Sequence, residues 1–489
     1  MAISRDSSAD ARVDVLVLGA GPAGLAAATA AVHAGARVTV VDAGPTPGGQ
    51  YWRHPPGSSP PGIGQHPTTR VYRMLAETVR ARTRYLSGHD VWAVERDDDG
   101  FAAHTVHEGA EVTVHARRLV LATGAHDRSL PFPGWDLPGV YSAGGAQSLW
   151  KGHRVTIGPR VAVGGTGPFL LPVAADLAAH GARVVGVFEA NHPRSWSRHL
   201  PAVTSSVGTF LRGAGHVATL SRHRVRPRVR HAVVAAHGDD HVEAVTVVRL
   251  TPEWTVVPGS SRVVECDAVA VGWGFTPRLE LPLALGCTTR LGADGSLVVR
   301  VDDHQATDVT GVYAAGEVCG VGGAALAVVE GELAGLAAAG ARAVPDRDRL
   351  ARLLGRRAQL RRFAQAIHEV YPVRPGWLSW LRPDTLVCRC EEVTVATVTN
   401  AVHELGATDA RSVKLLTRAG MGWCQGRMCG TGVAALAGAE AGTAATPHAF
   451  AERPVATPIP LGLLGRVEKP PLQPGPAPVP SHNRKDRPL

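Results

Sequence analysis

The 489-residue chain is poor in cysteine and lysine, and its basic residues form no continuous runs. The first of its seven cysteines is Cys266, so the N-terminal half holds no thiol at all. Lysines number only four against a Lys and Arg total of 51, and the arginines are scattered singly, without interleaved aromatic residues. The net charge of +9 is therefore no sign of a nucleic-acid partner, and we expect none.

Long apolar segments are also missing. No run of about eighteen apolar residues occurs, and the most apolar late stretch is interrupted by Glu330 and Glu332, so we expect no transmembrane segment. The N-terminal "MAISRDSSADARVDVLVLGAG" has no apolar core of the signal-peptide kind before its first expected strand. These features predict a cytoplasmic, reducing setting, in which cysteines are metal ligands or redox groups more often than disulfides.

Two segments share one pattern of elements. Residues 13–42 are expected to form a buried strand, a small-residue helix and a second strand, and residues 161–190 repeat that order. At this length about two to four domains are expected. The sequence therefore predicts an α/β protein with two Rossmann-like dinucleotide-binding domains.

The first unit carries the glycine fingerprint "GAGPAG". Gly19 permits the tight turn, Gly21 lets the backbone approach a pyrophosphate, and Gly24 lets the helix pack against the strand. Asp42 ends the second strand, where a carboxylate accepts hydrogen bonds from a ribose. The predicted nucleotide-binding residues of this unit are Gly19, Gly21, Pro22, Ala23, Gly24 and Asp42.

Three further segments identify the expected ligand as FAD. "PGGQYWR", "LVLATGA" and "GVYAAGE" contribute the predicted contacts Gly49, Gln50, Thr123, Gly124, Gly316 and Glu317. Together with the fingerprint they resemble the two-dinucleotide-binding-domain flavoproteins, the fold of the pyridine-nucleotide disulfide reductase superfamily, over about residues 12–345. The resemblance implies that Glu317 bonds the ribityl chain of FAD. The family usually has Asp at that position.

The second glycine turn, "GGTGPFL", offers Gly165 and Gly167 but places Leu170 at the third position. A larger side chain there widens the contact between helix and strand. Glu189 ends the following strand and favours NAD over NADP, whereas the nearby Arg194 argues the opposite. The sequence leaves three alternatives open for this site: NAD(P)(H), another adenine nucleotide, or no ligand.

Disulfide reduction is not expected. The disulfide reductases carry a pair of redox-active cysteines beside the flavin, whereas Cys266, Cys287 and Cys319 lie far from one another in sequence. Buried single cysteines are ordinarily inert.

Four cysteines gather near the C-terminus: Cys388, Cys390, Cys424 and Cys429. Four thiolates suit a tetrahedral zinc or an iron–sulfur cluster, and the Cys-x-Cys spacing is tight for a zinc knuckle. The segment "CRCEEVT…GMGWCQGRMC" resembles the [2Fe-2S] domain related to bacterioferritin-associated ferredoxin, in the form found in flavin-dependent dehydrogenase subunits. The resemblance implies a [2Fe-2S] cluster on these four residues. Zinc and no metal stay open as alternatives.

The predicted organisation has five parts. They are a discontinuous FAD-binding domain (12–152 and 279–345), an NAD(P)-binding-like domain (153–278), a helical connector (346–384), a [2Fe-2S] domain (385–440) and a Pro-rich tail (453–489). The whole resembles the FAD- and iron–sulfur-containing subunits of heteromeric amine and opine dehydrogenases. The resemblance implies a hetero-oligomer with an amine-oxidising flavin subunit, joined in some cases by a small ferredoxin-like chain.

Three hypotheses about function follow. The first is an electron-relay subunit that passes electrons between flavin and cluster. The second is a self-sufficient NAD(P)H oxidoreductase that feeds a soluble acceptor. The third is a non-catalytic scaffold with a structural zinc. His126 with the adjacent Asp127 looks like a base and its orienter, but among 22 histidines it is no basis for a catalytic role, and we assign none.

Overall fold

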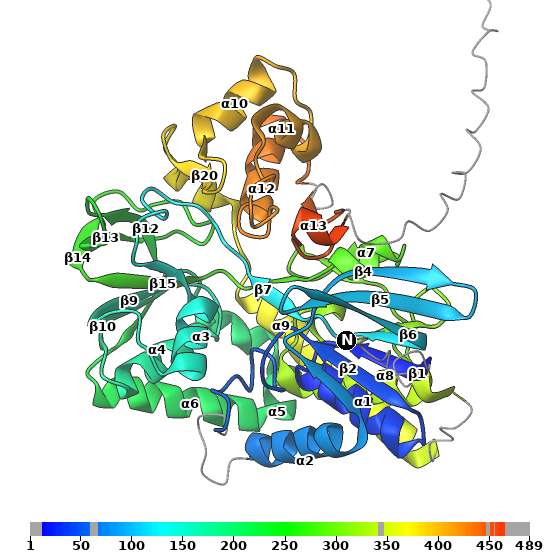
Figure 1. The fold of residues 1–489 in the computed structure, drawn as a ribbon. Helices are drawn as coiled ribbons and strands as arrows, with labels where there is room; N and C mark the ends of the chain where they lie inside the picture. The colour runs from blue at the N-terminus through cyan, green and yellow to red at the C-terminus, as the bar shows by residue number, and fades with distance from the viewer. Residues whose placement is uncertain (1–11, 59–66, 341–346, 446–449, 454, 465–489) are drawn as a thin grey trace, which may run out of the picture.

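The computed structural model describes residues 12–58, 67–340, 347–445, 450–453 and 455–464. Two α/β parts lie side by side, and a small part with the helices α10 (Val395–His403), α11 (Ala410–Thr417) and α12 (Gly430–Glu440) lies across one end of them (Figure 1). The predicted α/β class with two Rossmann-like units is confirmed.

The first part is built on a seven-stranded sheet. Its strands are β1 (Val13–Leu18), β2 (Val38–Asp42), β3 (Arg84–Ser87), β4 (Asp90–Asp97), β5 (Gly100–His107), β6 (Ala110–Leu121) and β19 (Val312–Ala314). The order is β3-β2-β1-β6-β5-β4, with β19 beside β6. The strands β3, β2, β1, β6 and β19 run parallel, whereas β4, β5 and β6 pair antiparallel with one another in sequence order.

Three helices accompany this sheet: α1 (Pro22–His33), α2 (Pro67–Arg82) and α8 (Ala324–Ala339). The helices α1 and α8 pack closely because small residues face one another. A Cβ atom on Gly331 or Gly335 of α8 would overlap the backbone of Ala23 or Ala27 of α1. The small-residue helix expected after the first strand therefore serves a helix–helix contact as well as a helix–sheet contact.

The second part has a five-stranded parallel sheet. Its strands in order are β11 (Pro227–Val229), β10 (Arg183–Glu189), β9 (Arg160–Gly165), β15 (Ala268–Gly272) and β8 (Val140–Ser142). Its helices are α3 (Ala143–His153), α4 (Leu170–Ala179), α5 (Leu200–Ser205) and α6 (Val207–Arg222). The structure places β8 in this sheet, although the predicted domain boundary assigns residues 140–152 to the first part.

Smaller sheets join these parts. An antiparallel sheet of β12 (His231–His237), β13 (Ala244–Arg249) and β14 (Arg262–Glu265) accompanies the second part. The strands β7 (Ala125–Asp127) and β16 (Phe275–Pro277) pair where the chain passes between the two parts. The remaining short elements are α7 (Glu280–Ala284), β17 (Thr289–Leu291) and β18 (Leu297–Val299).

The connector is helical, as predicted, and begins with α9 (Arg347–Val370). Its end carries a 3₁₀ turn at Pro375–Trp380, and the rings of Trp254, Trp273 and Trp380 pack against one another there.

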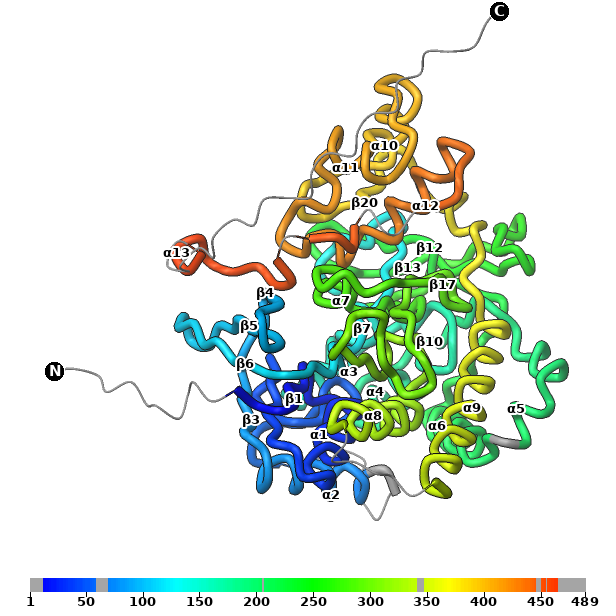
Figure 2. The backbone as a smooth tube through the Cα atoms, turned by 90° about the vertical axis from the view of Figure 1, so that its right-hand side faces the viewer, coloured from blue at the N-terminus to red at the C-terminus, as the bar shows by residue number. Residues whose placement is uncertain are grey.

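The C-terminal part contains β20 (Leu386–Cys388), β21 (Val393–Thr394) and the helices α10, α11 and α12 around its own small core. The chain then returns to the first sheet, where the amide of Ala456 donates to the carbonyl of Trp92 at 2.8 Å. Figure 2 shows this return and the short helix α13 (Leu461–Leu464) near β4 and β5. Most of the predicted Pro-rich tail, residues 465–489, lies outside the described residues.

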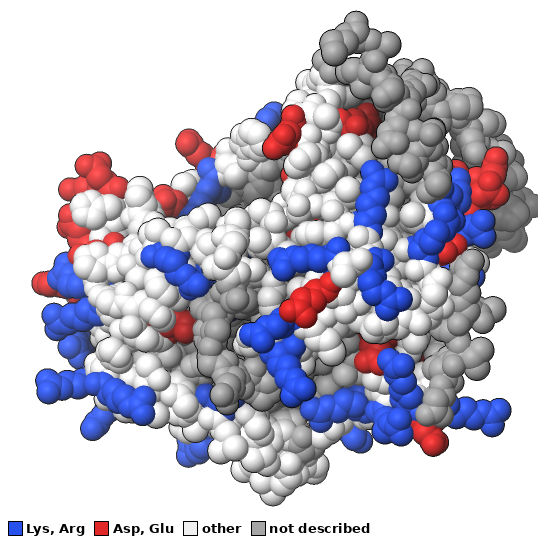
Figure 3. Space-filling model, turned by 60° about the horizontal axis from the view of Figure 1, so that its bottom comes forward, with Lys and Arg blue, Asp and Glu red and all other residues white. Residues whose placement is uncertain are grey.

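The surface carries more positive than negative side chains, as the net charge requires. On the face shown in Figure 3 the Lys and Arg side chains are spread over the whole surface, with uncharged residues between them. Within the described part of the chain, no helix is long and apolar enough to span a membrane.

Candidate flavin and cluster sites

One large cavity of about 1220 Å³ lies between the two α/β parts. It exceeds the roughly 300–1,000 Å³ of a typical small-molecule pocket, so it has room for an extended ligand. Twelve predicted site residues line it: Gly19, Gly21, Pro22, Ala23, Asp42, Gly49, Gln50, Thr123, Gly124, Gly167, Gly316 and Glu317. Gly24, Gly165 and Glu189 are not on its wall.

The first glycine turn is a tight cradle. Gly19 has a positive φ of 104°, and a Cβ atom there would overlap the carbonyl oxygen of Ala122. The backbones of Gly21 and Gly49 approach so closely that a Cβ on Gly49 would lie 2.8 Å from the Cα of Gly21. The two predicted motifs thus meet at the N-terminus of α1, where free N–H groups favour a phosphate. This geometry fits the pyrophosphate of FAD.

Gly24 has the packing role expected of it. A Cβ atom at this position would overlap the carbonyl oxygen of Gly19 and approach the side chain of Val17 at 3.3 Å. The residue is buried in α1 and holds the helix against the turn.

Replacement of Gly24 by Ala is expected to push α1 away from the glycine turn. Overpacking of this kind costs about 1–3 kcal/mol, and we expect a lower Tm together with weaker FAD binding, measured by thermal unfolding and FAD titration. Gly213→Ala is the matched control, because it lies in α6 with open space around it and gains about 0.5–1 kcal/mol of helix propensity. Unchanged FAD binding in Gly24→Ala would contradict the assigned packing role.

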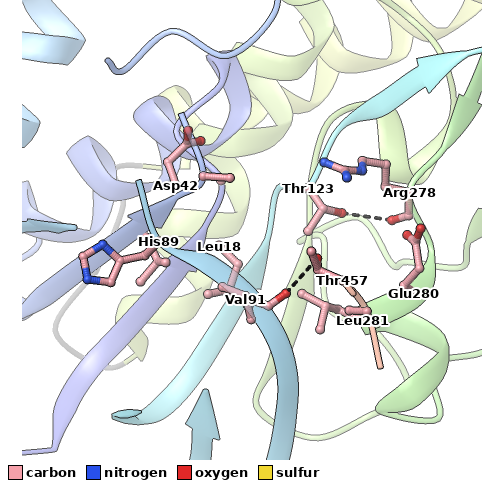
Figure 4. Close-up of a pocket in the computed structure, with 13 residues that line it drawn as sticks. Leu18, Asp42, His89, Val91, Thr123, Arg278, Glu280, Leu281 and Thr457 are labelled. Carbon is pink, nitrogen blue, oxygen red and sulfur yellow. Dashed lines mark hydrogen bonds between the residues drawn. The ribbon is translucent and has the colours of Figure 1, made fainter. Parts of the chain in front are cut away.

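Asp42 ends β2 at the wall of the cavity. Its carboxylate accepts hydrogen bonds from the amides of Ala20 at 2.5 Å and Gly44 at 2.6 Å. Burial raises the pKa of Asp42. A side cavity of about 90 Å³ adjoins it, and Figure 4 shows that cavity between Asp42 and His89 on one side and Thr123, Arg278 and Glu280 on the other.

Glu317 lies at the opposite end of the first unit, in the turn before α8. Its carboxylate accepts a hydrogen bond from the amide of Gly323 at 2.8 Å, and burial raises its pKa to about 7. The neighbouring Glu330 accepts from the amide of Gly316 at 3.0 Å and pairs with Arg361 at 2.7 Å. Glu317 is thus held at the cavity wall with Gly316, as its predicted role requires.

The second unit differs from the first at its carboxylate. Glu189 accepts hydrogen bonds from the hydroxyl of Thr166 at 2.7 Å and from the amides of Gly167 and Asn191 at 2.8 Å each. The side chain of Asn191 is in turn bound to the carbonyl of Pro372, which follows α9 in the connector, at 2.8 Å. Glu189 is 9% exposed, and burial raises its pKa to about 7. The role of Glu189 in binding a nucleotide stays a prediction, and the internal hydrogen bonds of its carboxylate do not favour that role.

The four C-terminal cysteines meet, as their spacing predicts. Cys429 hydrogen-bonds to both Cys388 and Cys424, and Cys424 also interacts with Cys390. These hydrogen bonds from Cys429 lower the pKa of Cys388 to about 6 and that of Cys424 to about 5. Backbone amides, including that of Gly420 toward Cys388 and that of Gly426 toward Cys424, stabilise the thiolates.

These contacts fit a cluster held by thiolates and supported by backbone N–H groups. Among the described residues no group of three or more His, Cys, Asp or Glu side chains has the arrangement of a site for a single metal ion, and Cys429 shares its hydrogen bonds with Cys388 and Cys424. Binding of iron requires that the shared protons leave. Phe450 packs under the cluster loop, where Cβ atoms on Gly420, Gly426 or Gly430 would come within 3 Å of its ring or Cβ.

The cluster loop, defined as residues 420–430, is fixed to the rest of the protein by ionic contacts. The guanidinium of Arg427 pairs with the buried Glu280 at 2.8 Å, and Arg453 of the returning chain pairs with the same carboxylate oxygen at 2.6 Å. Burial by itself raises the pKa of Glu280, but the two arginines outweigh it and lower that pKa below its ordinary value. Glu280 thus joins three segments that are distant in sequence.

Sequence reasoning missed Glu280 and Phe450. Both act through contacts with residues far along the chain, and neither lies in a recognisable motif. His126 is visible in the sequence, although no catalytic role is assigned to it there. The structure places it on the cavity wall, with its Nε2 3.1 Å from the carbonyl oxygen of Arg427 in the cluster loop.

The fold and the two sites define a class of protein: a FAD-dependent oxidoreductase with a [2Fe-2S] domain. Residues 13–340 match the pyridine nucleotide-disulphide oxidoreductase family, and residues 386–437 match the BFD-like [2Fe-2S] binding domain. The predictions of FAD and of a [2Fe-2S] cluster are confirmed on this basis, and the structural-zinc and no-metal alternatives are set aside.

The chain belongs to the pyridine nucleotide-disulphide oxidoreductase family, together with the A subunit of opine oxidase and the HcnB subunit of hydrogen cyanide synthase. It is 35% identical over 451 residues to the opine oxidase protein of Agrobacterium tumefaciens, covering 87% of this chain and 86% of that one. It is 32% identical to HcnB of Pseudomonas aeruginosa, covering 85% and 90%. Its fold is similar to that of L-proline dehydrogenase from P. horikoshii, with a TM-score of 0.65, 21% identity and coverage of 93% and 80%.

Proposed function

We propose that this chain is the electron-relay subunit of a heteromeric amino-acid, imino-acid or opine dehydrogenase. The observation that carries the proposal is the pair of contacts that the cluster loop makes through Arg427: one with His126 on the cavity wall and one with Glu280 beside the smaller side cavity. A flavin accepts two electrons as a hydride and releases them singly, whereas a [2Fe-2S] cluster carries one at a time. In this proposal the residues of this chain hold both groups, and the contacts of Arg427 connect the two sites.

The second unit supports a relay rather than an NAD(P)H oxidoreductase. The carboxylate of Glu189 already accepts three hydrogen bonds from groups of the protein itself, and the side chain of Asn191 is bound to the connector at Pro372. NADH seated in the ordinary way uses this carboxylate for its adenosine ribose. The NADH-dependent alternative therefore requires these internal hydrogen bonds to be shared or broken.

We further propose that the partner is an amine-oxidising flavin subunit, with a small ferredoxin-like chain in some assemblies, in the cytoplasm. The curated relatives carry subunit names, which supports a hetero-oligomer. Cys390 is exposed, and the side chain of Trp423, which precedes Cys424 in the chain, is 86% exposed. An aromatic residue at this position offers contact area to a partner beside the cluster. A reducing compartment keeps the four thiols available for iron.

Titration of the anaerobic, flavin-loaded chain with NADH and with NADPH tests the choice between these functions. We expect no bleaching of the flavin absorption and no turnover with a dye acceptor, because the second unit does not present Glu189 to a ribose. Full bleaching by dithionite in the same sample is the positive control. Rapid stoichiometric reduction by either nucleotide would favour the self-sufficient oxidoreductase.

A further inference from the structure

His126 sits where the cavity wall meets the cluster loop. It belongs to β7, the short strand that pairs with β16 between the two α/β parts, and it lines the cavity. Its Nε2 lies 3.1 Å from the carbonyl oxygen of Arg427. A carbonyl only accepts hydrogen bonds, so Nε2 carries the proton and Nδ1 carries the lone pair.

The opposite ring nitrogen is left unsatisfied. Nδ1 of His126 is buried and has no hydrogen-bond partner among the residues that the structure describes. Burial also lowers the pKa of His126 to about 4, so the ring is neutral at physiological pH. A buried polar atom without a partner costs stability, and its presence calls for an explanation other than folding.

The ring nitrogen that donates the hydrogen bond, Nε2, contacts the cluster loop. Arg427 stands two residues before Cys429, and its amide donates to the carbonyl of Cys424 at 3.0 Å. The hydrogen bond from His126 therefore acts on the backbone that carries two of the four cysteines. Ser129 makes a separate, weaker contact with the same loop, from its hydroxyl to the sulfur of Met428 at 3.8 Å.

We propose that His126 is a positioning residue for electron transfer, retained at a cost in stability because its Nε2–H bond couples the flavin cavity to the cluster loop. This inference rests on the proposed function and extends it to a particular residue. In such a transfer one electron would leave the reduced flavin and one ferric ion of the cluster would become ferrous. His126 neither gains nor loses a proton, and no bond to it forms or breaks.

Three variants test this role in the protein loaded with FAD and cluster. His126→Leu removes both the bond to Arg427 and the unsatisfied nitrogen. We expect the Tm of this variant to be equal to or higher than that of the wild type. A redox titration followed by electron paramagnetic resonance is expected to show a shifted midpoint potential of the cluster. After a light pulse reduces the flavin, we expect reduction of the cluster to be slowed on the order of tenfold. His126→Gln keeps an N–H donor at the Nε2 position and is expected to restore the potential and most of the rate. Ser129→Ala is the matched contact control and is expected to leave both unchanged.

Two results would overturn the inference. One is a His126→Leu protein with the wild-type potential and rate. The other is a lowered Tm with an unchanged potential, which would make the histidine merely structural. Failure of His126→Gln to restore either value would also count against the hydrogen bond. If flavin reduction leaves the wild-type cluster oxidised, the proposed relay fails, while the Tm and potential of the variants still decide the role of His126.

Discussion

Cys388→Ser and Cys424→Ser are each expected to abolish the [2Fe-2S] cluster while leaving FAD bound. Both sulfur atoms belong to the group of four thiols, and each receives backbone hydrogen bonds that suit a thiolate ligand. A serine hydroxyl stays protonated at neutral pH and is a poor ligand for iron. Iron analysis and the visible spectrum are expected to show less than about a tenth of wild-type iron with a full flavin band, since even the loss of an outer-shell partner of a metal ligand typically lowers metal affinity about ten- to hundredfold.

Cys266→Ala is the control for this experiment. Cys266 is buried among apolar residues of the second α/β part, and burial raises the pKa of its thiol to about 11. Its replacement is expected to leave iron content unchanged. Wild-type iron in either of the two Ser variants, or loss of iron in Cys266→Ala, would contradict the assignment of the ligands.

Glu280→Ala is expected to cost about 3–5 kcal/mol of unfolding free energy, because it leaves two arginines partly buried without their shared counter-charge. Glu280 is 7% exposed, and Arg427 and Arg453 both bind the same carboxylate oxygen. Loss of this contact also weakens the attachment of the cluster loop, which then depends on His126 and Ser129. Chemical denaturation measures the stability, and the linewidth of the cluster signal measures the order of the loop.

The same carboxylate predicts a pH dependence. Its folded pKa lies below the ordinary value of 4.5, so its contribution to stability is complete above about pH 4.5 and is lost as the pH falls through the folded pKa. Glu280→Gln removes this dependence. Glu332→Gln is the matched control, because its pair with Arg349 has side chains 26% and 47% exposed and is expected to change stability by less than about 1 kcal/mol. Equal losses in both Gln variants would contradict the special role of Glu280.

Much of this structure can be predicted from local patterns in the sequence. Gly19 and Gly49 need positive φ, Asp42 ends a strand at a fixed distance from the glycine turn, and the four cysteines lie in two close pairs. Each of these features acts within a few residues of its own position or within one βαβ unit, so spacing alone is enough to predict it.

The long-range contacts of the structure have no such local pattern in the sequence. Glu280 and Arg453 are 173 residues apart, and Asn191 and Pro372 are 181 apart. The sequence predicts Glu189 as a nucleotide-binding residue from its place at the end of a strand, but it cannot show the hydrogen bonds that Asn191 makes to Glu189 and to the connector. The sequence shows His126 beside Asp127, but it cannot show the hydrogen bond of His126 to Arg427, because the two residues are 301 positions apart.

The most direct test of the relay is light-driven reduction of the flavin in the anaerobic wild-type chain, followed by electron paramagnetic resonance of the frozen sample. We predict that the signal of a reduced [2Fe-2S] cluster appears as the flavin band returns, in one-electron stoichiometry, and that Cys388→Ser shows neither change. A reduced flavin that persists beside an oxidised cluster would contradict the account.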